Sequence, residues 1–149
     1  MTDAESETRK HIKQVQLLMI RFANDILDRA QVHDASKLES PEKELFDEHT
    51  HKLSAVTFGS PEYKKLLEDL KPALDHHYAR NPHHPEWHKA GISGMTLVDL
   101  MELIADWRSA VMRHSNGNVL RSIEINQERF GYSDELKQAL INTVKEYFP

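Results

Sequence analysis

The first thirty residues carry an apolar stripe that an α-helix gathers on one side of the chain. Its members recur at steps of three and four residues, the period of a helix. They are Ile12, Val15, Leu18, Met19, Phe22 and Ile26. The pattern predicts one long helix over residues 4–29, so the fold begins with a helix.

The remaining chain repeats helix signals and lacks strand signals. Ser40-Pro41-Glu42 and Ser60-Pro61-Glu62 each place a capping serine before a proline suited to the first helical position. Pro72 kinks or restarts the helix that follows the second signal. The predicted later helices cover residues 41–53, 61 to about 80, 97–113, 118–129 and 134–148. No stretch alternates as a strand would, so we expect an all-α fold, one compact domain of five to seven helices over residues 1–149.

Composition narrows the chemistry. The chain has no cysteine, so thiolate metal sites and disulfides are excluded, and any metal would be held by histidine and carboxylate. Such ligands suit Mn, Fe, Co, Ni or Zn. The net charge of −5 argues against binding of duplex nucleic acid. No apolar run is long enough to span a membrane, and the acidic N-terminus is unlike a signal peptide, so we expect a cytoplasmic protein.

The candidate site is centred on one short cluster of residues. His33 and Asp34 stand side by side, and Lys37 follows three residues later. At a helix end an adjacent imidazole and carboxylate can face one metal, and a carboxylate can bridge two. The chain has ten histidines in all, dispersed rather than gathered at a terminus. An alternative is that they are structural or scattered on the surface.

Helix phase sorts the other candidates. His11 continues the apolar stripe, with Glu7 one turn before it, although a place at a wet helix end is equally compatible with the spacing. His77 shares a face with Leu66, Leu70 and Ala73, which favours it over His76 as an inward residue. Asp106 shares a face of its helix with Asp99 and Glu102, and periodicity alone favours a solvated acidic face for it.

A histidine-rich loop is predicted over residues 81–95, because Asn81-Pro82 ends the preceding helix. It contains His83, His84 and Glu86, and flanking prolines are typical of a loop that holds a site. Trp87 and Trp107 could stack on a base, but core or rim packing is the commoner role for a tryptophan.

His11, His33-Asp34 and Asp106 resemble the H…HD…D pattern of the HD-domain superfamily of metal-dependent phosphohydrolases. The additional histidines are closer to the HD-GYP branch, whose central motif reads HD, one residue, Gly, Lys. Here Ser36 replaces the glycine, the Gly-Tyr-Pro sequence is absent, and only six residues separate His77 from His83. These departures argue against hydrolysis of a cyclic dinucleotide, and they leave open whether one or two metal ions bind.

The chain also resembles a small, largely uncharacterised phage and bacterial family. The motifs that carry this likeness are an HD-x-SK cluster, an HY-x-x-N-x-HHPE loop and a D-L-x-E-x-x-x-DW helix. They correspond here to residues 33–37, 77–86 and 99–107, and the resemblance as a whole covers most of the chain.

The HD resemblance implies roles for individual residues. One metal would be held by His11, His33, Asp34 and Asp106, and Asp34 would bridge to a second metal held by His77, His83 and His84. Lys37 would contact a substrate phosphate, and Asp34 and Lys37 are the candidate catalytic residues. The residues expected to orient these ligands or to touch the substrate are Glu7, His76, Asn81, Glu86, Glu102 and Arg108.

These expectations describe an enzyme that hydrolyses a small phosphorylated metabolite, most plausibly a nucleotide, with a metal-activated hydroxide. Two alternatives share almost the same ligands: an HD-like di-iron oxidase, and a non-catalytic metal-containing protein that binds nucleotides. A homodimer is compatible with the sequence. Metal content and turnover would separate these possibilities.

Overall fold

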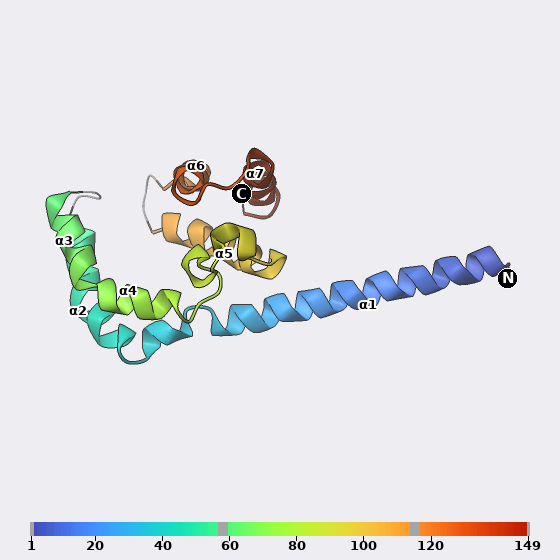
Figure 1. Cartoon of the computed structure of the whole chain (residues 1–149), viewed down its shortest axis with the longest axis horizontal. Coiled ribbons are helices and arrows are strands. Elements are labelled where there is room, and N and C mark those ends of the chain that lie inside the picture. Colours follow the sequence, from blue (N-terminus) through green and yellow to red (C-terminus); the bar gives the residue numbers. More distant parts are fainter. Residues whose placement is uncertain (1, 57–59, 114–116, 149) are drawn as a thin grey trace. The chain divides into compact units, whose positions relative to one another are not determined.

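The protein is described by a computed structural model over residues 2–56, 60–113 and 117–148, of which the side chains of 53–55 are left out (Figure 1). In these ranges all regular structure is helical, which confirms the predicted all-α class. The elements are α1 (Asp3–Val32), η1 (Ala35–Leu38), α2 (Glu42–Ala55), α3 (Pro61–Asp69), α4 (Lys71–Tyr78), η2 (Pro85–Trp87), η3 (Gly91–Gly94), α5 (Leu97–Val111), α6 (Val119–Phe130) and α7 (Asp134–Tyr147), where η marks a short 3-10 helix.

The chain divides into two compact units, the first ending with α1 at Val32 and the second running from His33 to Pro149. Taken by itself, α1 is an uninterrupted helix that carries the predicted apolar stripe, and Leu18 on that stripe is 67% exposed. The single domain predicted over residues 1–149 stays a prediction. Everything described below, unless α1 is named, belongs to the second unit.

An apolar core joins α5, α6 and α7. Its buried members are Ile92, Leu103, Ile104, Val119, Ile123, Tyr132, Leu140 and Val144. Each fully buried aliphatic side chain contributes roughly 1.5–3 kcal/mol, so one face of α5 is firmly anchored. Trp107 packs against this core, which is the packing role that the sequence favoured for it.

A second packed region lies at α4. Leu70, just before that helix, is 1% exposed and Ala73 is fully buried, and α4 lies against α2 and α3. The predicted restart at Pro72 is confirmed, because α3 ends at Asp69 and α4 begins at Lys71. His77 is buried on α4 beside Ala73, as the spacing predicted.

Side-chain caps explain most helix boundaries. Ser60 accepts a hydrogen bond from the Tyr63 amide at the start of α3, which confirms the predicted cap. Thr96 and Asp99 form a reciprocal capping box at the start of α5. The prediction for Ser40 is wrong by one position: Pro41 is itself the N-cap of α2, no side-chain cap is made, and the helix begins at Glu42.

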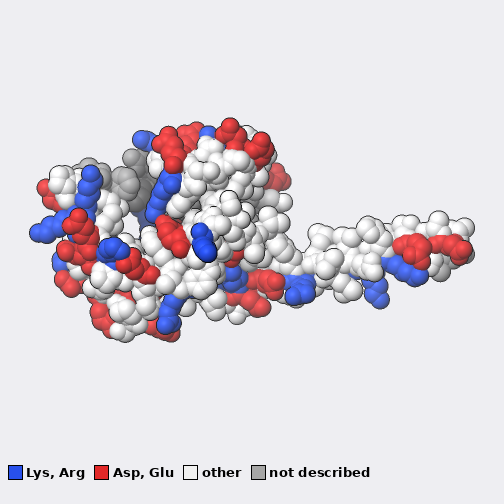
Figure 2. Space-filling model, in the orientation of Figure 1, with Lys and Arg blue, Asp and Glu red and all other residues white. Residues whose placement is uncertain are grey.

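The surface mixes both signs of charge. On the face that Figure 2 shows, acidic and basic side chains are interspersed over the second unit. None of the helices in the described ranges has both the length and the apolar character that crossing a membrane requires.

Tyr132 supplies the first testable prediction. It is 6% exposed, and its hydroxyl donates a 2.5 Å hydrogen bond to the Ile123 carbonyl of α6. We expect Tyr132→Phe to lower the free energy of unfolding by about 1 kcal/mol, the usual net worth of such a bond. Tyr147→Phe is the matched control, because Tyr147 is 71% exposed. Urea denaturation followed by circular dichroism measures both, and equal stabilities would contradict the assigned role.

The same hydroxyl gives a pH dependence. Burial raises the pKa of Tyr132 to about 12, above the value of about 10 for a tyrosine in an unfolded chain. The stabilisation is therefore complete below pH 10 and is lost as the pH rises from about 10 through 12. Melting temperatures of the wild type and Tyr132→Phe should converge over that range. A constant difference between them would show that the hydroxyl does not titrate with folding.

Candidate metal centre

Asp34 is the common point of the site, and its backbone explains how it comes to be there. The chain leaves α1 after Val32, and Asp34 takes a left-handed conformation with φ 56° and ψ 14° at the start of η1. Asp34 is the one residue other than glycine with positive φ in the described ranges. Aspartate tolerates this geometry better than most residues, and such backbone outliers gather at functional sites. The turn lets His33 and Asp34 face the same centre.

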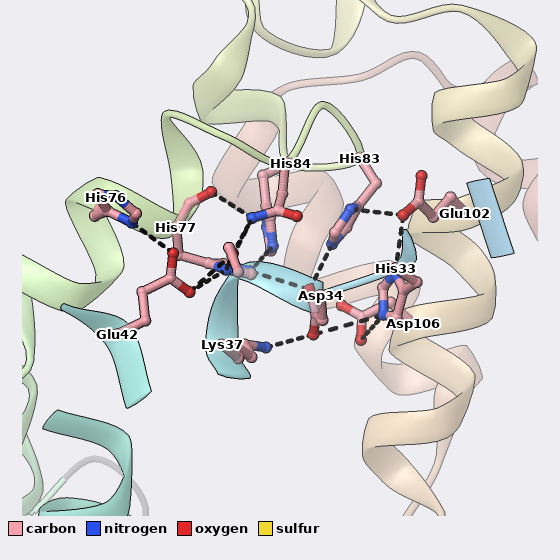
Figure 3. Close-up of polar contacts among 12 residues, drawn as sticks. His33, Asp34, Lys37, Glu42, His76, His77, His83, His84, Glu102 and Asp106 are labelled. Carbon is pink, nitrogen blue, oxygen red and sulfur yellow. Dashed lines mark hydrogen bonds and ion pairs between the residues drawn. The ribbon is translucent and has the colours of Figure 1, made fainter. Parts of the chain in front are cut away.

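Two imidazoles lie against one oxygen of this carboxylate, and a third imidazole lies against the first of them (Figure 3). Asp34 Oδ1 lies 3.2 Å from His77 Nε2 and 3.5 Å from His83 Nε2. The Nε2 atoms of His77 and His84 are 2.9 Å apart. We call this group, formed by Asp34 Oδ1, His77, His83 and His84, the imidazole position. Two ligands on one ion with bonds near 2.1 Å are about 3.0–3.4 Å apart, so the spacing suits a metal.

The second oxygen faces a different set. Asp34 Oδ2 lies 3.5 Å from His33 Nε2 and 2.5 Å from Lys37 Nζ. His33 Nε2 is also 3.7 Å from Asp106 Oδ1. We call the group of Asp34 Oδ2, His33 and Asp106 the carboxylate position. Both positions are among the groups whose ligand atoms lie close enough to share an ion, and Asp34 belongs to both.

Glu102 holds two of the imidazoles from outside. Its Oε1 accepts a 2.8 Å hydrogen bond from His33 Nδ1 and lies 3.0 Å from His83 Nδ1. Glu102 and Asp106 are one turn apart on α5, whose opposite face is anchored in the core. Carboxylates behind histidine ligands fix their orientation and tautomer. This kind of role was expected for Glu102 from the sequence. For Asp106, periodicity alone favoured a solvated acidic face, whereas the HD resemblance implied a metal ligand.

Glu42 plays the same part on the other side, and the sequence analysis missed it. It is fully buried, and its two oxygens accept hydrogen bonds of 2.7 Å from His76 Nδ1 and 2.9 Å from His77 Nδ1. Ser36 also donates to it, at 3.0 Å. In the sequence Glu42 is an ordinary acidic residue at a helix start. A buried partner for it could be found only after α2 and α4 were placed side by side.

These contacts assign the histidine pair at 76–77. His77 turns Nε2 toward Asp34, whereas His76 contacts Glu42 alone among the site residues and keeps part of its side chain exposed. Asn81, predicted near the site, is 7% exposed and donates to Ser36 Oγ at 2.9 Å and to the His77 carbonyl at 2.8 Å. It therefore braces the turn that carries the ligands.

The neighbouring charges and burial shift the pKa values of three residues at this site. The carboxylates of Asp106 and Glu102 raise the pKa of His33 to about 10. Burial works to raise the pKa of Asp34, but the contacts with His77 and Lys37 outweigh it and hold that pKa well below its usual range. Burial, together with the neighbouring imidazoles, lowers the pKa of His84 to about 3. His84 is therefore neutral at pH 7, the form in which a histidine binds metal.

The donor set fits a divalent transition metal. Within the described residues, Asp34 Oδ1 and both ring nitrogens of His83 are buried without an aligned hydrogen-bond partner. Unpartnered buried polar atoms are costly, and an ion between Asp34 Oδ1 and His83 Nε2 would remove that cost for these two atoms. Imidazole and carboxylate donors suit Mn, Fe, Co, Ni and Zn. The imidazole position offers four donors from the chain.

Four other predicted site residues lie elsewhere or stay unplaced. Glu86 pairs with Arg129 at 2.8 Å, and Arg108 donates to the Phe148 carbonyl at 3.0 Å, so both have structural partners. His11 and Glu7 lie on α1, where Glu7 pairs with Lys10 at 2.7 Å. Because α1 is a separate unit, His11 as a ligand stays a prediction.

Comparison with known families gives one match. The model of the family described as "Family of unknown function (DUF5662)" matches residues 1–147. The chain belongs to this family. Neither curated proteins nor solved structures gave a match. The resemblance to HD-domain phosphohydrolases therefore stays a prediction, and function has to be argued from the site.

Metal binding is the first property to test. We expect the wild type to bind Mn²⁺, Co²⁺, Ni²⁺ or Zn²⁺, and Asp34→Asn to weaken binding by more than about 100-fold because both positions lose a charged ligand. Asparagine keeps the shape and tolerates the left-handed backbone. Glu102→Gln should cost about 10–100-fold. Calorimetric titration and elemental analysis give the affinities and contents.

The control is His51→Ala, which alters an exposed histidine of α2 and should leave affinity unchanged. Equal metal content in the wild type and Asp34→Asn would move the site away from Asp34. His11→Ala decides whether His11 is a ligand, because unchanged affinity would show that His11 does not bind the ion.

Proposed function

We propose that this protein is a metal-dependent phosphohydrolase acting on a small phosphorylated metabolite, most plausibly a nucleotide. The observation that supports it is the convergence of His77, His83 and His84 on Asp34, with the Lys37 ammonium on the same carboxylate. A buried cluster of neutral and anionic donors beside a fixed cation suits an anionic substrate.

When bound, a divalent metal would supply a Lewis acid that acidifies water and neutralises phosphoryl charge. The chain supplies the rest. Asp34 presents one oxygen to each position, and Glu42 and Glu102 keep three imidazoles turned inward through their Nδ1 atoms. Fixed donors and charges of this kind need no rearrangement during the reaction.

Lys37 gives the site its preference for an anion. Its ammonium is a point charge with three donors, one of which is used by Asp34. The other two can contact phosphoryl oxygens. The 5.7 Å approach of Nζ to the Phe46 ring centre limits the freedom of the side chain. Lys37 therefore combines attraction for phosphate with a fixed location.

Phosphate release tests the proposal. The purified wild type, loaded with Mn²⁺, Co²⁺ or Ni²⁺, should release phosphate from at least one member of a panel of nucleoside mono-, di- and triphosphates over many turnovers. We expect Lys37→Met to lower kcat/KM by about 10²–10³-fold, as removal of a charge-stabilising donor does elsewhere, and Asp34→Asn to abolish turnover.

His51→Ala should retain full activity. A protein that contains metal but releases no phosphate from any of the substrates would overturn the proposal. If the protein then consumed oxygen with a bound iron pair, the di-iron oxidase hypothesis would replace the proposal. If the protein bound a nucleotide without turnover, the hypothesis of a non-catalytic nucleotide-binding protein would replace it.

A further inference from the structure

We infer that the Lys37 ammonium occupies the place of a second metal ion, so that the centre holds one ion, at the imidazole position. The inference rests on the metal site of the proposed function, but not on the reaction. It begins from the two oxygens of Asp34, which face different neighbours.

The imidazole position is complete without a cation from the protein. Its donors are three ring nitrogens and Asp34 Oδ1, and the described residues place no ammonium or guanidinium on that oxygen. Glu42 and Glu102 contact the Nδ1 atoms of His77 and His83. A carboxylate only accepts hydrogen bonds, so with the ring proton on Nδ1, toward Glu42 or Glu102, the lone pair of Nε2 faces the other ligand atoms.

The carboxylate position already has a cation. Lys37 Nζ is 2.5 Å from Asp34 Oδ2, closer than His33 Nε2, which lies 3.5 Å from the same oxygen. An ion at this position would need the same oxygen at a bond length near 2.1 Å. Two like charges on one carboxylate oxygen repel each other. The ammonium and a second divalent ion therefore exclude each other.

The backbone holds Lys37 in place. Residues 34 and 37 are separated by three positions across a 3-10 turn, a spacing at which side chains stand one above the other. The Lys37 amide donates to the Asp34 carbonyl at 2.9 Å, which closes that turn. The contact with Phe46 adds a third restraint. The ammonium is thus built into the turn that carries the shared ligand.

The test is the stoichiometry and magnetic state of Mn²⁺ bound to the full chain. After equilibrium dialysis we expect about one Mn²⁺ per wild-type chain and the paramagnetic resonance spectrum of an isolated ion. Lys37→Met, of similar length without the charge, should take up a second ion and show the exchange coupling of two ions bridged by Asp34. Lys37→Arg keeps a cation and should remain at one.

A double variant locates the second ion. Lys37→Met combined with Asp106→Asn should return to one ion, because the carboxylate position loses a ligand. Asp106→Asn alone should stay at one. Two ions in the wild type, or no second ion in a folded Lys37→Met protein, would overturn the inference. If Lys37→Met fails to fold, the comparison of the wild type with Asp106→Asn still decides it, since a fall from two to one contradicts the assignment.

The two proposals fail separately. One ion per chain without phosphate release would leave the inference standing and remove the proposed reaction. Two coupled ions with phosphate release would do the reverse. A wild type that binds no Mn²⁺ under any of these conditions would overturn the inference, and the phosphate assay under Co²⁺ and Ni²⁺ would decide the proposed reaction separately.

Discussion

The burial of one carboxylate, Asp34, organises the second unit of this protein. A carboxylate removed from water needs partners on both oxygens, and burial alone would favour its protonated form. Here one oxygen faces a lysine from the next turn and the other faces imidazoles from α4 and the loop that follows it. The left-handed backbone at this residue is the local cost of presenting both oxygens to the centre.

Glu42 and Glu102 extend that constraint outward. One lies at the start of α2 and contacts histidines of α4, and the other lies on α5 and contacts His33 and His83. The helices around the centre are therefore joined by polar contacts at a place where the apolar core of α5–α7 does not reach. Such networks are favourable only when their members are satisfied. This is a physical reason for the Nε2 atoms at the imidazole position to require a cation.

Local patterns predicted the helices well, and part of the site. Apolar spacing placed the inward face of α4, which selected His77 over His76, and the serine–proline pair at 60–61 marked the start of α3. Glu42 escaped notice because an acidic residue at a helix start has an ordinary local explanation, and its partners are more than thirty residues away. The ion pair between Lys37 and Asp34 was missed for a different reason. The sequence shows the spacing, but the 3-10 turn that brings the two together is a property of the folded chain.

A purely structural network of histidines would be built differently. In such a network each ring nitrogen needs a complementary partner, a donor for an acceptor. At the imidazole position the Nδ1 atoms of His77 and His83 lie against carboxylates. With the ring protons on Nδ1, the Nε2 atoms are acceptors, and they face another imidazole nitrogen and a carboxylate oxygen. Acceptors that converge on acceptors are stabilised by a positive charge between them. A proton could satisfy one such pair of acceptors, whereas one metal ion can bind all four ligand atoms at once. This difference favours a metal centre over structural histidines.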